Sequence, residues 1–247
     1  MELLVIAIWS FAVAVAGGVA GLVLGNMRLP VLLQFASSPA AGAGANVAVS
    51  GLSALTASIA HWRGGRIDWR LFWLMAPPSL LGGVLGGVLS GVLPKRFLLG
   101  AIAVVVLFGA YEISRRGRFA DAGDRPGGGV GVAIAIAFAV GVLGGLVGLI
   151  LGALRLPAMV KWLGTAPKAA VGTNAATGAM VGLGGLLGHL TSGVDWNLLA
   201  AGACGAIPGA YLGAQLTGKL DDEALLRVIA VILVIAGLVL AVEALLG

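Results

Sequence analysis

Charged side chains are scarce in this 247-residue sequence. They make up 10% of it, whereas hydrophobic residues make up 60%. A soluble domain carries roughly 25% charged residues, so the scarcity excludes an ordinary soluble globular protein. Apolar runs of about 18 or more residues recur along the chain, and such runs predict membrane-spanning helices rather than the alternating strands of a barrel. We therefore expect an all-α, multi-pass integral protein of the bacterial inner (plasma) membrane.

Cysteine and long polar stretches are nearly absent too. The single cysteine, Cys204, has no partner for an intramolecular disulfide and lies in an apolar run, where a small core residue is the expected role. The longest polar stretch covers residues 114–128, which leaves no room for a separate soluble domain. The net charge of +5 comes from arginines in short loops between apolar runs. Such arginines indicate topology determinants and no nucleic-acid partner.

The sequence also lacks the residue sets that catalysis and cofactor binding require. No cluster of metal ligands and no nucleophile with a neighbouring base stands out. The glycine-rich stretches, residues 82–91 and 141–152, lack the Lys-Ser/Thr pair of a phosphate-binding loop. We therefore expect that the protein is not an enzyme and that it binds neither a metal ion nor a cofactor.

What the sequence does contain is a ten-residue phrase that occurs twice, at residues 21–30 and 148–157. Glycine, leucine, glycine, arginine, leucine and proline recur in the same register. Glycine and proline loosen or end a helix, and an arginine at membrane depth costs a few kcal/mol. Because helix-breaking residues and a costly arginine occur together in both copies, we expect a functional site at these positions. The first candidate site residues are Gly25, Arg28, Gly152 and Arg155.

The second half of the chain repeats the first at an offset of about 127 or 128 residues. We expect a first transmembrane repeat over residues 1–114, a basic cytoplasmic linker over residues 115–128 and a second transmembrane repeat over residues 129–247. The short apolar pieces at residues 28–38 and 155–165 are too short to cross a hydrocarbon core of about 30 Å as helices. They are expected to be half-helices that meet unwound chain near the midplane, where it lines a cavity.

The basic residues favour one orientation of the two repeats. If each half crosses the membrane four times, the repeats are parallel and Lys and Arg fall about evenly on both sides. If the short pieces count as crossings, the repeats are inverted, and roughly 12 of the 15 Lys and Arg residues lie on one side. The positive-inside rule expects the second distribution. We predict a polytopic helical bundle of two inverted-topology repeats, with about 8–10 membrane segments and both chain ends outside.

Three stretches together resemble the TauE/SafE sulfite exporter family of membrane permeases. They are the repeated phrase, the run Pro-Lys-Ala-Ala-Val-Gly-Thr-Asn at residues 167–174 and the His…Gly-Val-Asp-Trp loop at residues 189–196. The family phrase is similar to Gly-Ile-Gly-Gly-Gly followed five residues later by proline. Both copies here keep the outer glycines and the proline but replace the middle glycines by Val-Leu or Ile-Leu. The resemblance implies transport, usually export, of sulfite or of small organosulfur anions such as sulfoacetate.

Two interpretations of Arg28 and Arg155 stay open. As site residues they would clamp an anion at the helix breaks, because the planar guanidinium matches sulfonate or carboxylate oxygens. Helices that begin after Pro30 and Pro157 would add favourable dipoles. As anchors, the two arginines would snorkel to the nearest headgroup layer.

The polar residues one helix along the chain have two interpretations as well. Asn46, Asn174 and Thr173 either line the cavity and orient the anion or form hydrogen bonds between packed helices. His61 and His189 lie at the ends of the polar helices. Each either couples transport to protons, because histidine titrates near neutral pH, or marks a helix end at the membrane interface.

The function that we predict is translocation of a small anion by alternating access, at a midplane site between the repeats. The expected partners are that anionic substrate, the lipid bilayer, a coupling ion (proton or sodium) and a second copy of the chain in a homodimer. A passive anion channel and a non-transport scaffold or receptor are the alternatives.

Overall fold

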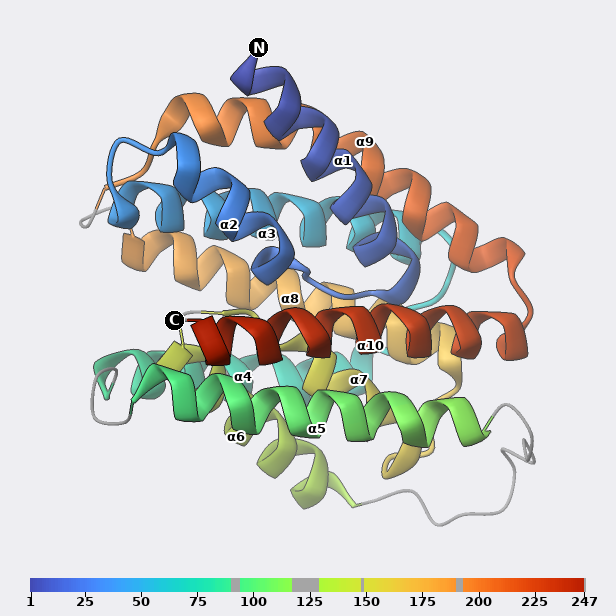
Figure 1. Ribbon diagram of the computed structural model, residues 1–247. Helices are drawn as coiled ribbons and strands as arrows, with labels where there is room; N and C mark the ends of the chain where they lie inside the picture. The colour runs from blue at the N-terminus through green and yellow to red at the C-terminus, as the bar shows by residue number, and fades with distance from the viewer. Residues whose placement is uncertain (90–93, 117–128, 148, 190–192, 247) are drawn as a thin grey trace.

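The computed structural model describes residues 1–89, 94–116, 129–147, 149–189 and 193–246, and this part of the chain consists of helices and short connections. The helices are α1 (Glu2–Ala20), α2 (Gly25–Phe35), α3 (Pro39–Arg63), α4 (Trp69–Val88), α5 (Lys95–Arg116), α6 (Val130–Val147), α7 (Gly152–Lys161), α8 (Pro167–His189), α9 (Trp196–Lys219) and α10 (Asp222–Leu246) (Figure 1).

The lengths and composition of these helices confirm a helical multi-pass membrane protein. Within the described ranges, six helices are long and apolar enough to cross a membrane, namely α1, α3, α5, α6, α8 and α10. By contrast, α2 has 11 residues and α7 has 10. At 1.5 Å per residue these two helices cover only about half of a hydrocarbon core.

The break in the first half comes before Arg28, so the predicted helix start after Pro30 is wrong. Helix α1 ends at Ala20, because Gly21 adopts a positive φ of 62° and caps it in the left-handed conformation. Only glycine takes this conformation without strain. Helix α2 then begins at Gly25 and continues through Pro30. In the second half α7 likewise begins at Gly152 and contains Pro157, so both arginines lie in the first turn of a short helix.

Two pairs of equivalent helices, α3 with α8 and α5 with α10, pack against each other and run in opposite directions. In the pair α3 and α8, Gly51 packs on Gly182, and Val47 packs on Gly185, further along α8. In the pair α5 and α10, Gly100 faces Ala244, whereas Leu107 packs on Gly237. Figure 1 shows the same antiparallel course for α5 and α10. Repeats of inverted topology would produce this arrangement. The inverted relation of the whole repeats stays a prediction.

The first helix of each half packs along the fourth helix of the other half. A methyl group at Gly209 of α9 would lie 2.5 Å from the carbonyl oxygen of Phe11 in α1. The equivalent contact, 127 residues away, joins Gly82 of α4 to the carbonyl oxygen of Phe138 in α6. Glycine at these positions lets the two backbones touch, because it has no side chain between them.

The helix ends fall on two sides of the bundle. The chain ends at α1 and α10 lie on one side, which we call the termini side, and the linker ends of α5 and α6 lie on the other, the linker side (Figure 1). On the linker side Lys161 forms a 2.5 Å ion pair with Glu112 near the end of α5. On the termini side Asp195 caps α9. Burial alone would raise the pKa of Asp195, but hydrogen bonds from the backbone N–H groups of Leu198 and Ser37 outweigh it and lower that pKa.

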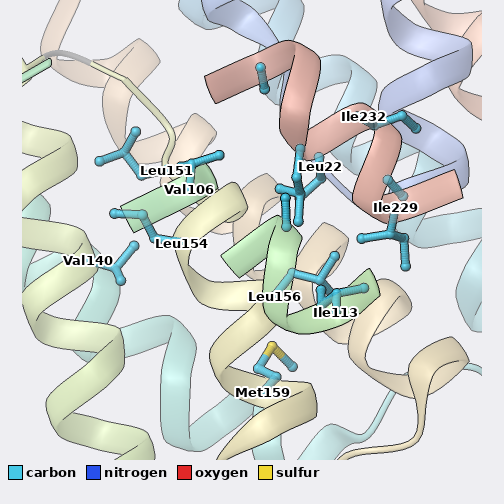
Figure 2. Packing of buried hydrophobic residues seen from close by; sticks show 14 of the residues in the cluster. Leu22, Val106, Ile113, Val140, Leu151, Leu154, Leu156, Met159, Ile229 and Ile232 are labelled. Carbon is cyan, nitrogen blue, oxygen red and sulfur yellow. The ribbon is translucent and has the colours of Figure 1, made fainter. Parts of the chain in front are cut away.

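The largest buried apolar cluster joins both halves around the short helix α7. Figure 2 shows Leu156 and Met159 of α7 among side chains of α5 and α10, with Leu22 and Leu151 of the two breaks close by. Leu156 and Met159 are fully buried. This packing holds α7, and with it Arg155, in a fixed position inside the bundle.

Candidate functional site

Arg28 is buried in the first turn of α2, with 2% of its surface exposed. Its Nε donates to Oδ1 of Asn46 at 3.1 Å, and its Nη2 donates to Oγ of Ser50 at 2.6 Å and to the carbonyl oxygen of Asn46 at 3.5 Å. Both partners come from the middle of α3, one helix along the chain. The side chain therefore points into the bundle and does not snorkel to a headgroup layer.

Arg155 occupies the equivalent place in α7 and is also 2% exposed. Its Nε donates to Oδ1 of Asn174 at 2.7 Å, and its Nη1 donates to Oγ of Ser79 at 3.1 Å. Its Nη2 is buried and has no hydrogen-bond partner. Asn174 in turn donates to the carbonyl oxygens of Gly21 at 2.8 Å and Gly152 at 3.2 Å. The side-chain amide of Asn174 thus connects the helix breaks of both halves to Arg155.

The two arginines differ because two serines are not repeated. Ser50 holds Nη2 of Arg28, but Gly178 stands at the equivalent position, 128 residues on, and has no hydroxyl. Ser79 holds Nη1 of Arg155, and the residue 127 positions on is Ala206. The two arginines therefore have unequal environments, because the sequence of α3 differs from that of α8 and the sequence of α4 differs from that of α9 at these positions.

Neutral groups alone hold both arginines in the described contacts. The partners are amides, hydroxyls and a carbonyl, and among the residues that the structure covers no carboxylate lies within ion-pair distance of either guanidinium. A buried charge without a counter-charge is costly, by several kcal/mol per ion. Among the described residues, both guanidiniums are therefore buried without a counter-charge.

Three neighbouring cavities, which share lining residues, lie beside and between the two arginines. The largest, about 470 Å³, reaches Arg155 and lies among the termini-side ends of α4, α6 and α8. A middle cavity of about 30 Å³ lies between the breaks and shares Val47 and residues 149–151 with the first. A third, about 10 Å³, reaches Arg28 and is lined by the linker-side end of α1. It shares Val23, Leu24 and Ser50 with the middle cavity. The arginines thus line separate cavities and do not form one clamp.

The other predicted site residues lie at varying distances from these cavities. Gly25 lies against Asn46 and Ser50, and Gly152 lies against Asn174, so both glycines let an arginine-bearing helix approach its partner. Thr173 accepts a hydrogen bond from the backbone N–H of Asp68 at 2.9 Å and ties the α3–α4 loop to α8. The side chain of His189, at the end of α8, lies outside the described residues.

His61 is fully buried on the linker side, where it joins the α1 break to the α3–α4 loop. Its Nδ1 accepts a hydrogen bond from Nε of Arg66 at 3.0 Å, and its Nε2 lies 3.3 Å from the carbonyl oxygen of Gly18. A carbonyl oxygen only accepts, so Nε2 carries the proton and the imidazole is neutral. Arg66 also donates to the carbonyl oxygens of Ala60 and Ala214, which fastens the loop to α9.

Sequence reasoning missed two site residues. Asn26 lies inside the first copy of the repeated phrase and lines the middle cavity, and its Nδ2 is buried without a partner. The second copy has Ala153 at this place, and that difference between the copies was the available signal. Ser79 also has an alanine, Ala206, at the equivalent position, but it lies in an apolar run outside the repeated phrase, so no motif singled it out.

Comparisons with known proteins agree with the architecture. A family model described as Sulfite exporter TauE/SafE matches residues 6–240. The chain is also 33% identical over 105 residues to "Probable membrane transporter protein YunE" of Bacillus subtilis (strain 168). That match covers 42% of this chain and 38% of the Bacillus protein. No solved structure matches the chain.

Proposed function

The chain belongs to the sulfite exporter TauE/SafE family, and from this premise we propose that it carries a small anion across the membrane by alternating access. Sulfite or an organosulfonate such as sulfoacetate is the proposed cargo. The observation that carries the proposal is the pair of equivalent guanidiniums, each buried at a helix break and held by neutral groups alone. An anion at either arginine supplies the missing counter-charge.

The unequal cavities support a carrier over an open channel. The cavity at Arg155 is large, whereas the middle cavity and the one at Arg28 have room for about one water each or less. In this conformation an anion could enter from the termini side and would be stopped at the breaks. If each half adopted the conformation that the other half now has, the cavity at Arg155 would close and the cavity at Arg28 would open. Transporters with inverted repeats alternate between their two open states in this way.

The basic side chains support a cytoplasmic position for the linker side. On this side Arg63 ends α3, Arg66 lies in the α3–α4 loop and Arg70 lies in the first turn of α4. Lys161 and Lys219 end α7 and α9. The positive-inside rule places such residues in the cytoplasm. The large cavity then opens outward, and the cavity at Arg28 would open to the cytoplasm.

We propose His61 as the residue through which a proton couples to the cycle. In this conformation, in which the linker side is closed, Nδ1 of His61 accepts a hydrogen bond from Arg66. Protonation of Nδ1 would remove that acceptor and put two positive charges side by side. The α3–α4 loop would then loosen from α9 and uncover the cavity at Arg28. Sodium as the coupling ion and the homodimer stay predictions.

Flux through proteoliposomes tests the proposal. Uptake and efflux of labelled sulfite, sulfoacetate, taurine and a plain carboxylate would be measured for the unchanged chain and for Arg28→Met and Arg155→Met. We expect saturable flux of at least one sulfur oxyanion and a loss of tenfold or more in each variant. Arg96→Met, outside the site, is the matched control and should keep its flux. If no sulfur oxyanion moves or competes, the cargo is wrong. If flux survives both variants, the arginines are not the site.

A further inference from the structure

We propose that a groove between α3, α8 and the start of α4 binds one acyl chain of an anionic phospholipid, whose head group lies at Arg63 and Arg70 on the linker side. The groove has a volume of about 430 Å³ and shares no lining residue with the cavities at Arg28 and Arg155. It is therefore a separate site, and the proposal does not depend on what the protein transports.

The wall of the groove is apolar and opens toward the lipid phase. Aliphatic side chains of α3 and α8 form most of it, namely Leu52, Leu55, Ile59, Met180, Leu183 and Leu186. Three of them, Leu55, Ile59 and Leu183, are exposed on the outside of the bundle. The hydroxyl of Ser58 also lies in the wall, but it donates to the carbonyl oxygen of Leu55 at 2.8 Å. Water gains little on such a wall, whereas an acyl chain supplies the van der Waals contacts that an empty groove lacks.

The length of the groove suits one acyl chain of one leaflet. The lining residues of α3 extend from Ala48 to Trp62, which is about 21 Å at 1.5 Å per residue. One leaflet supplies about half of a hydrocarbon core of about 30 Å. A chain that enters from the linker side can therefore lie in the groove over the whole depth of its leaflet.

Two tryptophans place the linker-side end of the groove at the head-group layer. Trp62 near the end of α3 and Trp69 at the start of α4 both line the groove, and both are exposed. Trp69 packs edge-on against Phe72, another lining residue, with ring centroids 5.6 Å apart. Exposed tryptophans of membrane proteins gather where the hydrocarbon core meets the head groups. A lipid in the groove would therefore have its head group beside the α3–α4 loop.

Arg63 and Arg70 supply free positive charge at this end. Each directly follows one of the two tryptophans, and both are exposed. Among the residues that the structure covers, neither forms a hydrogen bond or an ion pair, whereas Arg66 between them is bonded to His61 and α9. Asp68 is the acidic residue of this loop, so the loop keeps a net positive charge. An anionic phosphate head group is complementary to that charge.

The equivalent loop of the second half keeps the aromatic residue but not the charge. Trp69 recurs as Trp196, whereas Thr191 and Asn197 stand at the positions equivalent to Arg63 and Arg70. Residues 189–197 contain no lysine or arginine. The sequence therefore predicts this lipid site on the linker side only.

Native mass spectrometry of the full chain in mild detergent tests the role of the charge. It would give the dissociation constant of the first bound lipid for phosphatidylglycerol and for phosphatidylcholine with the same acyl chains. We expect phosphatidylglycerol to bind about tenfold more tightly or better. Arg63→Gln and Arg70→Gln should each weaken it about fivefold, the factor for about 1 kcal/mol per basic residue, and leave phosphatidylcholine unchanged. Arg115→Gln is the matched control, because Arg115 is exposed on the same side but does not line the groove.

A filled groove tests the role of the apolar wall. Ala179 lines the groove and is half-buried, so Ala179→Phe should weaken the first bound lipid of either kind fivefold or more. Ala135→Phe, at an exposed position in the linker-side half of α6, should leave binding unchanged. Phosphatidylglycerol with a photoreactive group in its acyl chain should label peptides of α3 and α8, and Ala179→Phe should lose that label.

Four results would overturn the proposal. Equal affinity for the two lipids, or an equal loss in Arg115→Gln, would show only the general attraction of a basic surface for anionic lipid. Label spread evenly over the lipid-facing helices would show that the groove is not a site. Displacement of the lipid by glycerol phosphate, which has no acyl chain, would mean that the groove plays no part. Dimers that exclude the label from α3 and α8 would identify a second copy of the chain as the occupant.

Discussion

At the scale of single residues, the two arginines show how a repeated sequence produces an unequal site. The phrase around Arg28 and Arg155 left open whether the guanidiniums line a site or snorkel to the headgroups, and the structure buries both at the helix breaks. Their partners could be predicted only in part. Asn46 and Asn174 repeat and were found, but Ser50 and Ser79 do not repeat, and a serine in a helix is most often a packing residue. Which serine meets which arginine depends on helix packing, which one sequence does not display.

Ser50→Ala is a direct test of the Arg28 environment. The variant removes the hydroxyl that accepts from Nη2 at 2.6 Å and leaves this buried charged donor with only the long contact to the carbonyl oxygen of Asn46 at 3.5 Å. We expect the free energy of unfolding to fall by about 1–3 kcal/mol, measured by denaturant titration in mild detergent. Ser53→Ala is the matched control on the same helix, because Ser53 bonds only to the carbonyl oxygen of Val49 in its own helix. Equal losses in both variants would contradict the role given to Ser50.

At the scale of helices, glycine decides both where the chain breaks and how closely it packs. The patterns in the sequence placed a helix break at each repeated phrase, but they took proline as the point after which the short helix begins. Proline was misleading because it removes only one backbone hydrogen bond, whereas Gly21 turns the chain into the left-handed conformation that ends α1. The small-residue pattern in α4 and α9 allows close helix contact. It could not name the partners, because α4 and α9 each pack on the first helix of the other half.

Gly213→Ala tests these backbone contacts. A methyl group there would collide with the carbonyl oxygen of Val15 in α1, so the two helices must separate. Overpacking of this kind costs about 1–3 kcal/mol, and we expect a lower melting temperature in detergent. Gly131→Ala, in the open first turn of α6, should raise stability slightly, because alanine favours a helix by up to about 1 kcal/mol over glycine. A melting temperature that rises for Gly213→Ala as well would disprove the close contact.

At the scale of the whole molecule, the two halves combine repeated architecture with unequal cavities. Equivalent helices pack in antiparallel pairs, α3 with α8 and α5 with α10. Yet the space at Arg155 is about 470 Å³ and that at Arg28 about 10 Å³. Charge counting predicted the orientation of the repeats, but no sequence pattern predicted which cavity is open. That difference depends on the conformation that the bundle adopts, and it is the central feature of the proposed carrier.

Cysteine accessibility at two equivalent positions tests this central claim most directly. Ser53 lines the cavity at Arg28, and Val181, 128 residues on, lines the cavity at Arg155. Each would be changed to cysteine in a Cys204→Ser background, because Cys204 is exposed and is not the core residue that the sequence predicted. The variants would be labelled in membrane vesicles with a thiol reagent that does not cross the bilayer. Without substrate, we expect Val181→Cys to react with reagent added on the termini side and Ser53→Cys to stay protected. When the transported anion is added, Ser53→Cys should become reactive toward reagent on the linker side. Reaction of both cysteines from the same side, unchanged by anion, would contradict alternating access.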